Sequence, residues 1–211
     1  QTDRQTDRQT DRQTDRQTDR QTDRQTGIFE NSVWYPDYYR STDDNRFILH
    51  HFIKDFIFQH RLRYIVYFRL AQKTKNHLIK FALEYKLFRL SRKYGIEIKT
   101  STKIGKGFIM THAYNITISP YAQIGENCNI MKGATIGLSN GRHPGAPIIG
   151  DRVYIGLNAT LLGGISVGDD VLIAPNTLVN KDIPAHSVVI GNPCMIVHRE
   201  NATGPYIKYP V

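Results

Sequence analysis

Hydrophobic residues divide the 211-residue chain into segments with different periods. Residues 1–26 repeat the tetrapeptide QTDR six times, end on QT and contain no apolar residue. Because such a segment has nothing to bury, it cannot offset the entropy cost of ordering, and we expect a disordered low-complexity tail. The repeat of four is close to the helical period, so a frayed helix paired by Asp and Arg is the alternative.

Residues 27–96 have the hydrophobic pattern of helices. Apolar residues recur three and four positions apart in RFILHHFIKDFIFQHRLRYIVYFRLAQ (46–72) and in NHLIKFALEYKLFRLSRKYG (76–95). The pattern predicts two helices, the second ending at Gly95. The first is rich in aromatic residues, with Lys and Arg among them. We interpret the segment as a helical cap packed on the following domain; the alternative is an interfacial helix on an anionic membrane surface.

From residue 97 to residue 199 the hydrophobic period changes to six. Apolar residues fall six apart in three runs, separated by a two-residue slip and by the interruption SNGRHPGAP. The runs are Ile98, Ile104 and Met110; Ile118, Ile124, Ile130 and Ile136; and Ile149, Ile155, Leu161, Val167, Ile173 and Val179. A period of six is typical of a hexapeptide β-helix.

In such a helix each six-residue unit forms one short strand and one corner, and three units close a triangular coil. The inward apolar residues of stacked coils build a continuous core that no single coil could bury. The thirteen register positions correspond to about four to five coils. The fold class is therefore mainly β: a parallel β-helix over residues 97–199, preceded by a short helical segment and followed by a tail over 200–211.

Charge is unevenly distributed along the chain, whose formal net charge is +9. Residues 27–96 contain 13 Lys and Arg against 6 Asp and Glu, whereas residues 97–211 contain 9 against 7. A basic partner surface, such as one for the cytoplasmic face of the inner membrane, therefore belongs to the helical segment. No nucleic-acid-binding motif accompanies the charge, and no apolar run is long enough to span a membrane. Cys128 and Cys194 lack metal-ligand or redox spacing, so we expect reduced thiols in a cytoplasmic protein.

Several motifs of the six-residue region resemble one family. YGIEI, IGKGFIMTHAYNITIS, KGATIG, GRHP, IGDRVYIG and VVIGNPCMIV resemble the left-handed β-helix acyltransferases, and within them the serine acetyltransferase group. The resemblance implies a left-handed coil, a homotrimer with active sites between neighbouring prisms, and acetyl-CoA as the acyl donor. It also implies that VIGNP closes the coils at Pro193, beyond which the tail leaves the prism.

Two histidines mark the irregular points of the repeat. His112 lies in the two-residue slip and His143 in the long interruption. Acyl transfer to a hydroxyl requires a base, and histidine suits that role near neutral pH. We therefore expect both to be catalytic, and the six other histidines to be structural or surface residues. By the resemblance, Glu97 occupies the position of the carboxylate that orients the first histidine.

The residue before His112 departs from the serine acetyltransferase pattern. Thr111 replaces an Asp that, by the resemblance, helps to bind the amino group of serine. We therefore expect the acceptor to be a hydroxyl of a bacterial surface saccharide, in capsule or lipopolysaccharide. Thr111, Tyr114 and Asn115 are the expected sugar contacts, and Arg142 the partner of an acidic sugar's carboxylate. Serine acetylation for cysteine biosynthesis is the alternative, and a β-helix scaffold without catalysis is a second.

Small residues along the later coils are expected to line the donor site. By the resemblance, Gly137 lets the thioester approach, while Gly156 and Ala174 leave room for the pantetheine arm. Lys181 is the expected partner of a phosphate of acetyl-CoA. The alternative is that the small residues serve packing alone. The sequence carries no metal-ligand cluster, Rossmann glycine pattern or P-loop.

The QTDR repeat has an explanation at the level of DNA. The four-base word CAGA, read in triplets, gives CAG, ACA, GAC and AGA, which encode Gln, Thr, Asp and Arg. Gain or loss of one four-base unit shifts the reading frame, so the repeat predicts phase-variable expression. Because such switching suits a surface antigen, it favours the saccharide acceptor.

Overall fold

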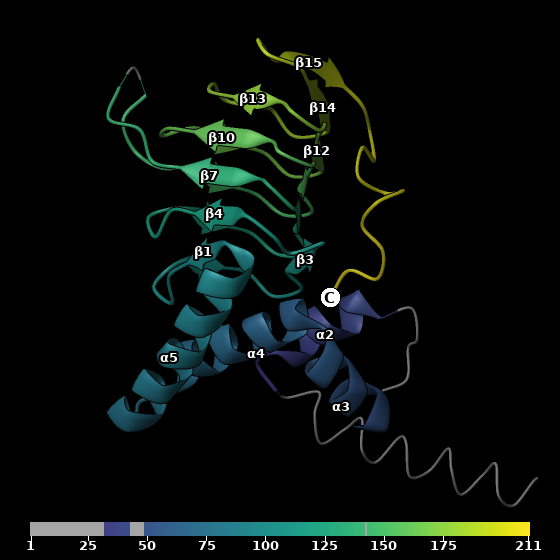
Figure 1. Ribbon diagram of the computed structural model, residues 1–211. Helices are drawn as coiled ribbons and strands as arrows, with labels where there is room; N and C mark the ends of the chain where they lie inside the picture. Colours follow the sequence, from purple (N-terminus) through teal and green to yellow (C-terminus); the bar gives the residue numbers. More distant parts are fainter. Residues whose placement is uncertain (1–31, 43–48, 142) are drawn as a thin grey trace, which may run out of the picture.

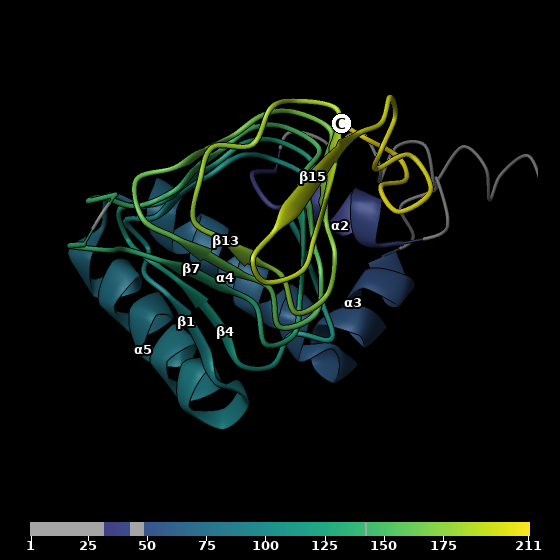
Figure 2. The same ribbon diagram turned by 90° about the horizontal axis from the view of Figure 1, so that it is seen from above.

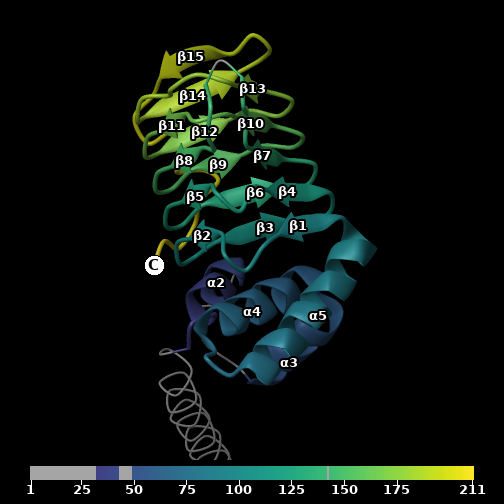
Figure 3. The same cartoon turned by 90° about the vertical axis from the view of Figure 1, so that its left-hand side faces the viewer.

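The computed structural model describes residues 32–42, 49–141 and 143–211. The QTDR tail, for which we expect disorder, lies outside the described residues, and so does Arg142. Within them, a group of helices lies at one end of a prism of short strands (Figures 1 and 3), and the prism is triangular when it is seen from above (Figure 2). Among these residues, no helix combines the length and the hydropathy needed to cross a bilayer.

The helices of the described part are α2 (Tyr35–Ser41), α3 (Leu49–Phe58), α4 (His60–Lys73) and α5 (His77–Tyr94). The sequence pattern predicts one helix across residues 46–72, but α3 and α4 are separate. The helix is interrupted at Gln59, whose backbone is extended. The Gln59 amide donates to the Asp55 carbonyl and its side chain donates to Asp55 Oδ1, which closes the end of α3. The pattern also does not predict α2, which has Pro36 in its first turn.

The helix α5 begins and ends where its sequence indicates. Asn76 Oδ1 accepts hydrogen bonds from the amides of Leu78 and Ile79, at 3.0 and 3.2 Å. Gly95 ends the helix with a φ of +68°, a left-handed conformation that glycine adopts at low cost. A Cβ at Gly95 would clash with the side chain of Asn115, so the glycine also lets α5 approach the second coil closely.

Three sheets form the faces of the prism, in the orders β1-β4-β7-β10-β13, β11-β8-β5-β2 and β15-β14-β12-β9-β6-β3. The strands are β1 (Ile96–Ile98), β2 (Lys103–Ile104), β3 (Ile109–Thr111), β4 (Ile116–Ile118), β5 (Gln123–Ile124), β6 (Asn129–Met131), β7 (Thr135–Gly137), β8 (Ile148–Ile149), β9 (Tyr154–Ile155), β10 (Thr160–Leu162), β11 (Ser166–Val167), β12 (Val171–Ile173), β13 (Leu178–Val179), β14 (Ser187–Ile190) and β15 (Met195–His198). Paired strands are parallel, except that β15 runs antiparallel to β14 and closes the upper end.

The predicted β-helix is confirmed by the register of its strands. Ile98 pairs with Ile118, Ile118 with Ile136, and Ile136 with Leu161, at successive levels of one face. These side chains are at most 8% exposed and form a column inside the prism. In Figure 1 the front strands run from right to left as the chain climbs, from the end of α5 towards the loop after β7, so the coil is left-handed.

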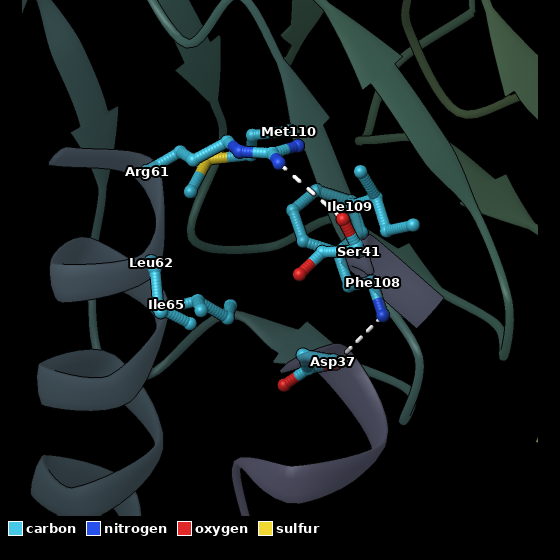
Figure 4. A pocket seen from close by; sticks show the side chains of 8 residues that line it. All are labelled: Asp37, Ser41, Arg61, Leu62, Ile65, Phe108, Ile109 and Met110. Atoms are coloured by element: carbon cyan, nitrogen blue, oxygen red, sulfur yellow. Dashed lines mark hydrogen bonds between the residues drawn. The ribbon is translucent and has the colours of Figure 1, made fainter. Parts of the chain in front are cut away.

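A buried ion pair joins the helices to the prism. Arg69 Nε of α4 lies 2.8 Å from Asp37 Oδ2 of α2, and both side chains are nearly inaccessible to solvent. Asp37 Oδ1 accepts the Phe108 amide of the first coil at 2.6 Å, beside a small pocket that is shown in Figure 4. Arg69 also donates to the Ile104 carbonyl at 2.6 Å. The helical segment thus packs beneath the first coil, as the cap interpretation predicts.

The C-terminal residues return along the prism towards the helices (Figure 1). Asp170 accepts hydrogen bonds from the amides of Ala202 and Thr203, at 3.0 Å each, and from the Thr203 hydroxyl at 2.7 Å. Near the end of the chain, Asn127 and the backbone of Val211 exchange two hydrogen bonds. The tail therefore stays on the prism instead of leaving it after the last coil.

Candidate active site

His112 lies on the corner between β3 and β4, where the six-residue period slips. Met110 and Ile118, on either side, are both buried, and the two extra residues between them widen the corner. His112 has a φ of +50°, a left-handed conformation that is uncommon for residues other than glycine. Its side chain is exposed, so the imidazole is accessible at the edge of the prism.

Three rings from different elements pack beside this corner. The ring of His60, at the start of α4, stacks on Tyr94 with the ring centroids 4.0 Å apart, and Tyr114 packs against His60 at 4.8 Å. His60 Nε2 lies 2.9 Å from the carbonyl oxygen of Ala113. From the sequence we expect His60 to be a structural or surface residue, with no link to His112. No local sequence signal could reveal this contact, because His60 and Ala113 are 53 residues apart in the chain.

Thr111 and Glu97, which we expect to act with His112, lie on two different strands. Thr111 ends β3 and is half-buried, whereas Glu97 is the central, exposed residue of β1, paired in register with Thr117 of β4. Among the residues that the structure describes, no hydrogen bond joins the Glu97 carboxylate to the His112 imidazole. The orienting role of Glu97 stays a prediction. The Asn115 amide donates to the Tyr94 carbonyl at 2.9 Å, so the backbone of Asn115 helps to hold the corner.

His143 lies in the loop between β7 and β8. Ser139 and Gly145 exchange two hydrogen bonds of 2.9 Å each, which close the base of the loop. The His143 carbonyl accepts the Gly164 amide of the next coil at 3.0 Å. Gly163 has a φ of +93°, and a Cβ there would lie 2.6 Å from the same carbonyl oxygen. The position of His143 therefore depends on close contact with a glycine turn above it.

The predicted site residues fall on two different edges of the prism. One edge follows the strands β3, β9 and β12 and carries His112, Gly156 and Ala174. The other edge follows β7 and β13 and carries Gly137, Lys181 and the His143 loop. The five-stranded sheet separates the two edges: in Figure 1 the loop after β7 lies to its left, and β3 and β12 lie to its right. One protomer therefore does not bring His112 and His143 together.

Packing explains part of the small-residue pattern along these edges. A Cβ at Gly156 would lie 2.7 Å from the Ile173 carbonyl oxygen, so the close stacking of coils itself requires glycine there. At Gly137 the nearest atom to a Cβ would be Leu162 Cδ1, the end of a flexible side chain, at 2.9 Å. Lys181 is exposed on a turn. Of these three donor-site candidates, packing therefore dictates the identity of Gly156 but not that of Gly137 or Lys181.

Residues 146–181 match the family model described as "Bacterial transferase hexapeptide (six repeats)". Among curated relatives, serine acetyltransferase 2 of Arabidopsis thaliana is 36% identical over 135 residues, which is 62% of this chain and 41% of that protein. A serine acetyltransferase of Helicobacter pylori is 36% identical over 108 residues, which is 50% of this chain and 63% of that protein. The chain thus spans between two fifths and two thirds of the length of these relatives.

Solved structures are similar over more of the fold. Serine acetyltransferase of Neisseria gonorrhoeae in complex with serine matches with a TM-score of 0.63 and 25% identity, over 81% of this chain and 68% of that chain. A serine acetyltransferase in complex with CoA matches with a TM-score of 0.58 and 26% identity, over 67% of this chain and 58% of that chain. The prism and part of the helical segment are therefore similar to those of the serine acetyltransferases.

The expectation of a surface saccharide as acceptor is wrong. The relatives and solved structures reported above are serine acetyltransferases, which favours serine, the alternative acceptor. The expectation depends on the single replacement at Thr111 and on the DNA-level explanation of the QTDR repeat. The replacement at Thr111 removes a single charge, and a repeat that predicts phase-variable expression does not identify the acceptor.

Proposed function

We propose that this chain, which has the β-helix of the hexapeptide-repeat acyltransferases, transfers the acetyl group of acetyl-CoA to the hydroxyl of serine. The observation that carries the proposal is the match to serine acetyltransferases in both sequence and fold, including structures in complex with serine and with CoA. O-Acetylserine would then be the product, and the reaction would serve cysteine biosynthesis.

In the proposed reaction His112 is the general base. Its imidazole takes the proton of the serine hydroxyl as the oxygen attacks the thioester carbonyl carbon. The tetrahedral intermediate then collapses, the carbon–sulfur bond breaks, and the CoA thiolate receives the proton from the imidazolium. Glu97 stabilises the imidazolium in this scheme, and Arg142, beside His143 in the sequence, pairs with the serine carboxylate.

The proposed site forms between two copies of the chain. His112 on one edge and His143 on the other are separated by the five-stranded sheet, so a site that uses both needs a neighbouring prism. A cyclic homotrimer places the first edge of each copy against the second edge of the next, which closes three equivalent sites. Gly137 and Lys181, on the His143 edge, would then meet the donor that reacts at His112.

An acetyl-transfer assay tests the proposed function. The purified chain is incubated with acetyl-CoA and one acceptor at a time, and thiol release is followed. Serine should give turnover, whereas threonine, homoserine and a panel of sugars serve as control acceptors. Thiol release that requires a sugar, with none above background for serine, would contradict the proposal.

We also propose that α5 lies on an anionic membrane surface. Five apolar residues of this helix have exposed fractions from 53% to 82%: Ile79, and the four regularly spaced residues Leu78, Phe81, Tyr85 and Phe88. The spacing of three and four places these four residues along one side of the helix. Five basic residues accompany them, Lys80, Lys86, Arg89, Arg92 and Lys93, against the single acidic residue Glu84. An aromatic and basic helix face complements anionic lipid headgroups.

A further inference from the structure

We propose that His60 is a positioning residue for the catalytic corner: its hydrogen bond to the Ala113 carbonyl holds the backbone that presents His112. The proposal depends on the proposed function only for the role of His112 as base. It rests on three contacts made by one side chain, to Tyr94, to Tyr114 and to the Ala113 carbonyl. We call His60, Tyr94 and Tyr114 the aromatic clamp.

The hydrogen bond fixes the tautomer of His60. A carbonyl oxygen only accepts, so Nε2, 2.9 Å from the Ala113 oxygen, must carry the proton. Burial lowers the pKa of His60, and the charges of Arg63 and nearby basic residues lower it further, against the opposing effect of the Ala113 carbonyl. At neutral pH the ring is therefore neutral, donates through Nε2 and leaves Nδ1 unprotonated.

The corner needs such support because its backbone is strained. His112 and Asn115 have φ values of +50° and +52°, and neither is a glycine. Residues in this region persist when the surrounding structure fixes them. The Asn115 amide donates to the Tyr94 carbonyl, and the Tyr114 carbonyl accepts the Gly133 amide, each at 2.9 Å. These two contacts join backbone to backbone.

Unlike these two backbone hydrogen bonds, the hydrogen bond from His60 to the Ala113 carbonyl is made by a side chain. It fixes the Ala113–Tyr114 peptide group, which is the second peptide group after His112. Loss of this contact frees the Ala113 carbonyl and lets the His112 backbone relax. A general base displaced by about 1 Å from its reacting position can lose much of its effect on the rate. His60 thus affects catalysis through the backbone that carries His112.

Two substitutions separate the functions of the ring. His60→Phe keeps an aromatic ring against Tyr94 and Tyr114 but removes the donor to Ala113. His60→Gln restores an N–H group at a similar reach without the ring. His77→Phe, at the exposed first residue of α5, is the matched control for loss of a histidine.

The first readout does not depend on turnover. Histidine imidazole signals are recorded by NMR in the intact protein with ¹³C-labelled histidine, and the signal of His112 is assigned by a single substitution. In His60→Phe the His112 signal should shift or split, and in His60→Gln it should return towards its wild-type position. The signal of His77, at the exposed first residue of α5, is assigned with His77→Phe and should stay unchanged in both His60 variants.

Kinetics supply the second readout. In His60→Phe we expect kcat to fall by about 3- to 30-fold, with the KM for acetyl-CoA and the melting temperature close to wild type. His60→Gln should recover most of the loss. An unchanged His112 signal in a folded His60→Phe variant would overturn the positioning role. A wild-type protein that does not acetylate serine would overturn the proposed function instead, and the NMR result would still decide the role of His60.

Discussion

His112 and His143 lie on opposite edges of the prism, at the two ends of the strands of the five-stranded sheet: His112 comes before β4 and His143 after β7. The sheet presents a flat outer face between them, with Glu97 exposed on its first strand. If both histidines act in one reaction, they belong to different copies of the chain. A site shared in this way would make catalysis depend on the assembly of the copies.

Substitution of the base should abolish most turnover. For His112→Ala we expect kcat with serine to fall by about 10²- to 10⁴-fold, the range of general-base catalysis. The Kd for CoA should change little, because the imidazole acts on the acceptor hydroxyl. Steady-state kinetics and calorimetric CoA titration measure the two quantities. His77→Ala is the control, and a His112→Ala enzyme with near wild-type kcat would contradict the assignment.

The position of the His143 loop should be sensitive to a single methyl group added at Gly163. Gly163→Ala places a Cβ 2.6 Å from the His143 carbonyl oxygen, at a φ of +93°. We expect the loop to shift and kcat to fall by about tenfold, because the catalytic group is misplaced. Gly141→Ala, where the nearest atom lies 3.5 Å from the added Cβ, is the matched control. Equal kcat values for the two variants would show that the turn does not position His143.

Asp170, which holds the C-terminal tail, should make the free energy of unfolding depend on pH in the acid range. Burial alone would raise the pKa of Asp170, but hydrogen bonds from Thr203, His186 and Ala202 lower it to about 2. A lowered pKa in the folded state stabilises the fold above the ordinary value of 3.8, and this contribution is lost as pH falls towards 2. The shift corresponds to about 2 kcal/mol.

Urea unfolding at pH 6 and pH 3 measures this dependence. The wild type should lose more stability between the two pH values than Asp170→Asn, which has no carboxylate to protonate. The same loss in both proteins would mean that other groups govern acid unfolding.

The exposed face of α5 should bind anionic vesicles. Replacing Phe81 and Phe88 by Ser removes two apolar side chains, each worth about 1.5–3 kcal/mol when fully buried. We expect retention on vesicles with anionic lipid to fall by at least about tenfold, with serine turnover unchanged in solution. Vesicles of neutral lipid are the control. Retention by the double variant equal to that of the wild type would end the membrane proposal.

The repeat of the prism could be predicted from sequence because its signal is local. A buried apolar residue at every sixth position produces pairs such as Ile98 with Ile118 at successive levels. The end of α5 at Gly95 is equally local, since a left-handed residue after a helical pattern favours glycine. His112 and His143 were identified because each interrupts the period.

Contacts between distant segments could not be predicted in the same way. Asp37 and Arg69 are 32 residues apart, and His60 and Ala113 are 53 apart, so no periodic pattern connects them. The acceptor was predicted wrongly for a related reason. Thr111 is a single position, and one replacement does not by itself define the acceptor.

Subunit mixing tests most directly whether the site is shared between copies. His112→Ala and His143→Ala proteins, each nearly inactive alone, are unfolded, mixed in equal amounts and refolded together. In a cyclic trimer, about one quarter of the sites (1/2 × 1/2) should combine an intact His112 with an intact His143 from the neighbour. The mixture should therefore regain about one quarter of the activity that refolded wild type shows in serine acetylation. A mixture that remains as inactive as its two components would contradict the shared site.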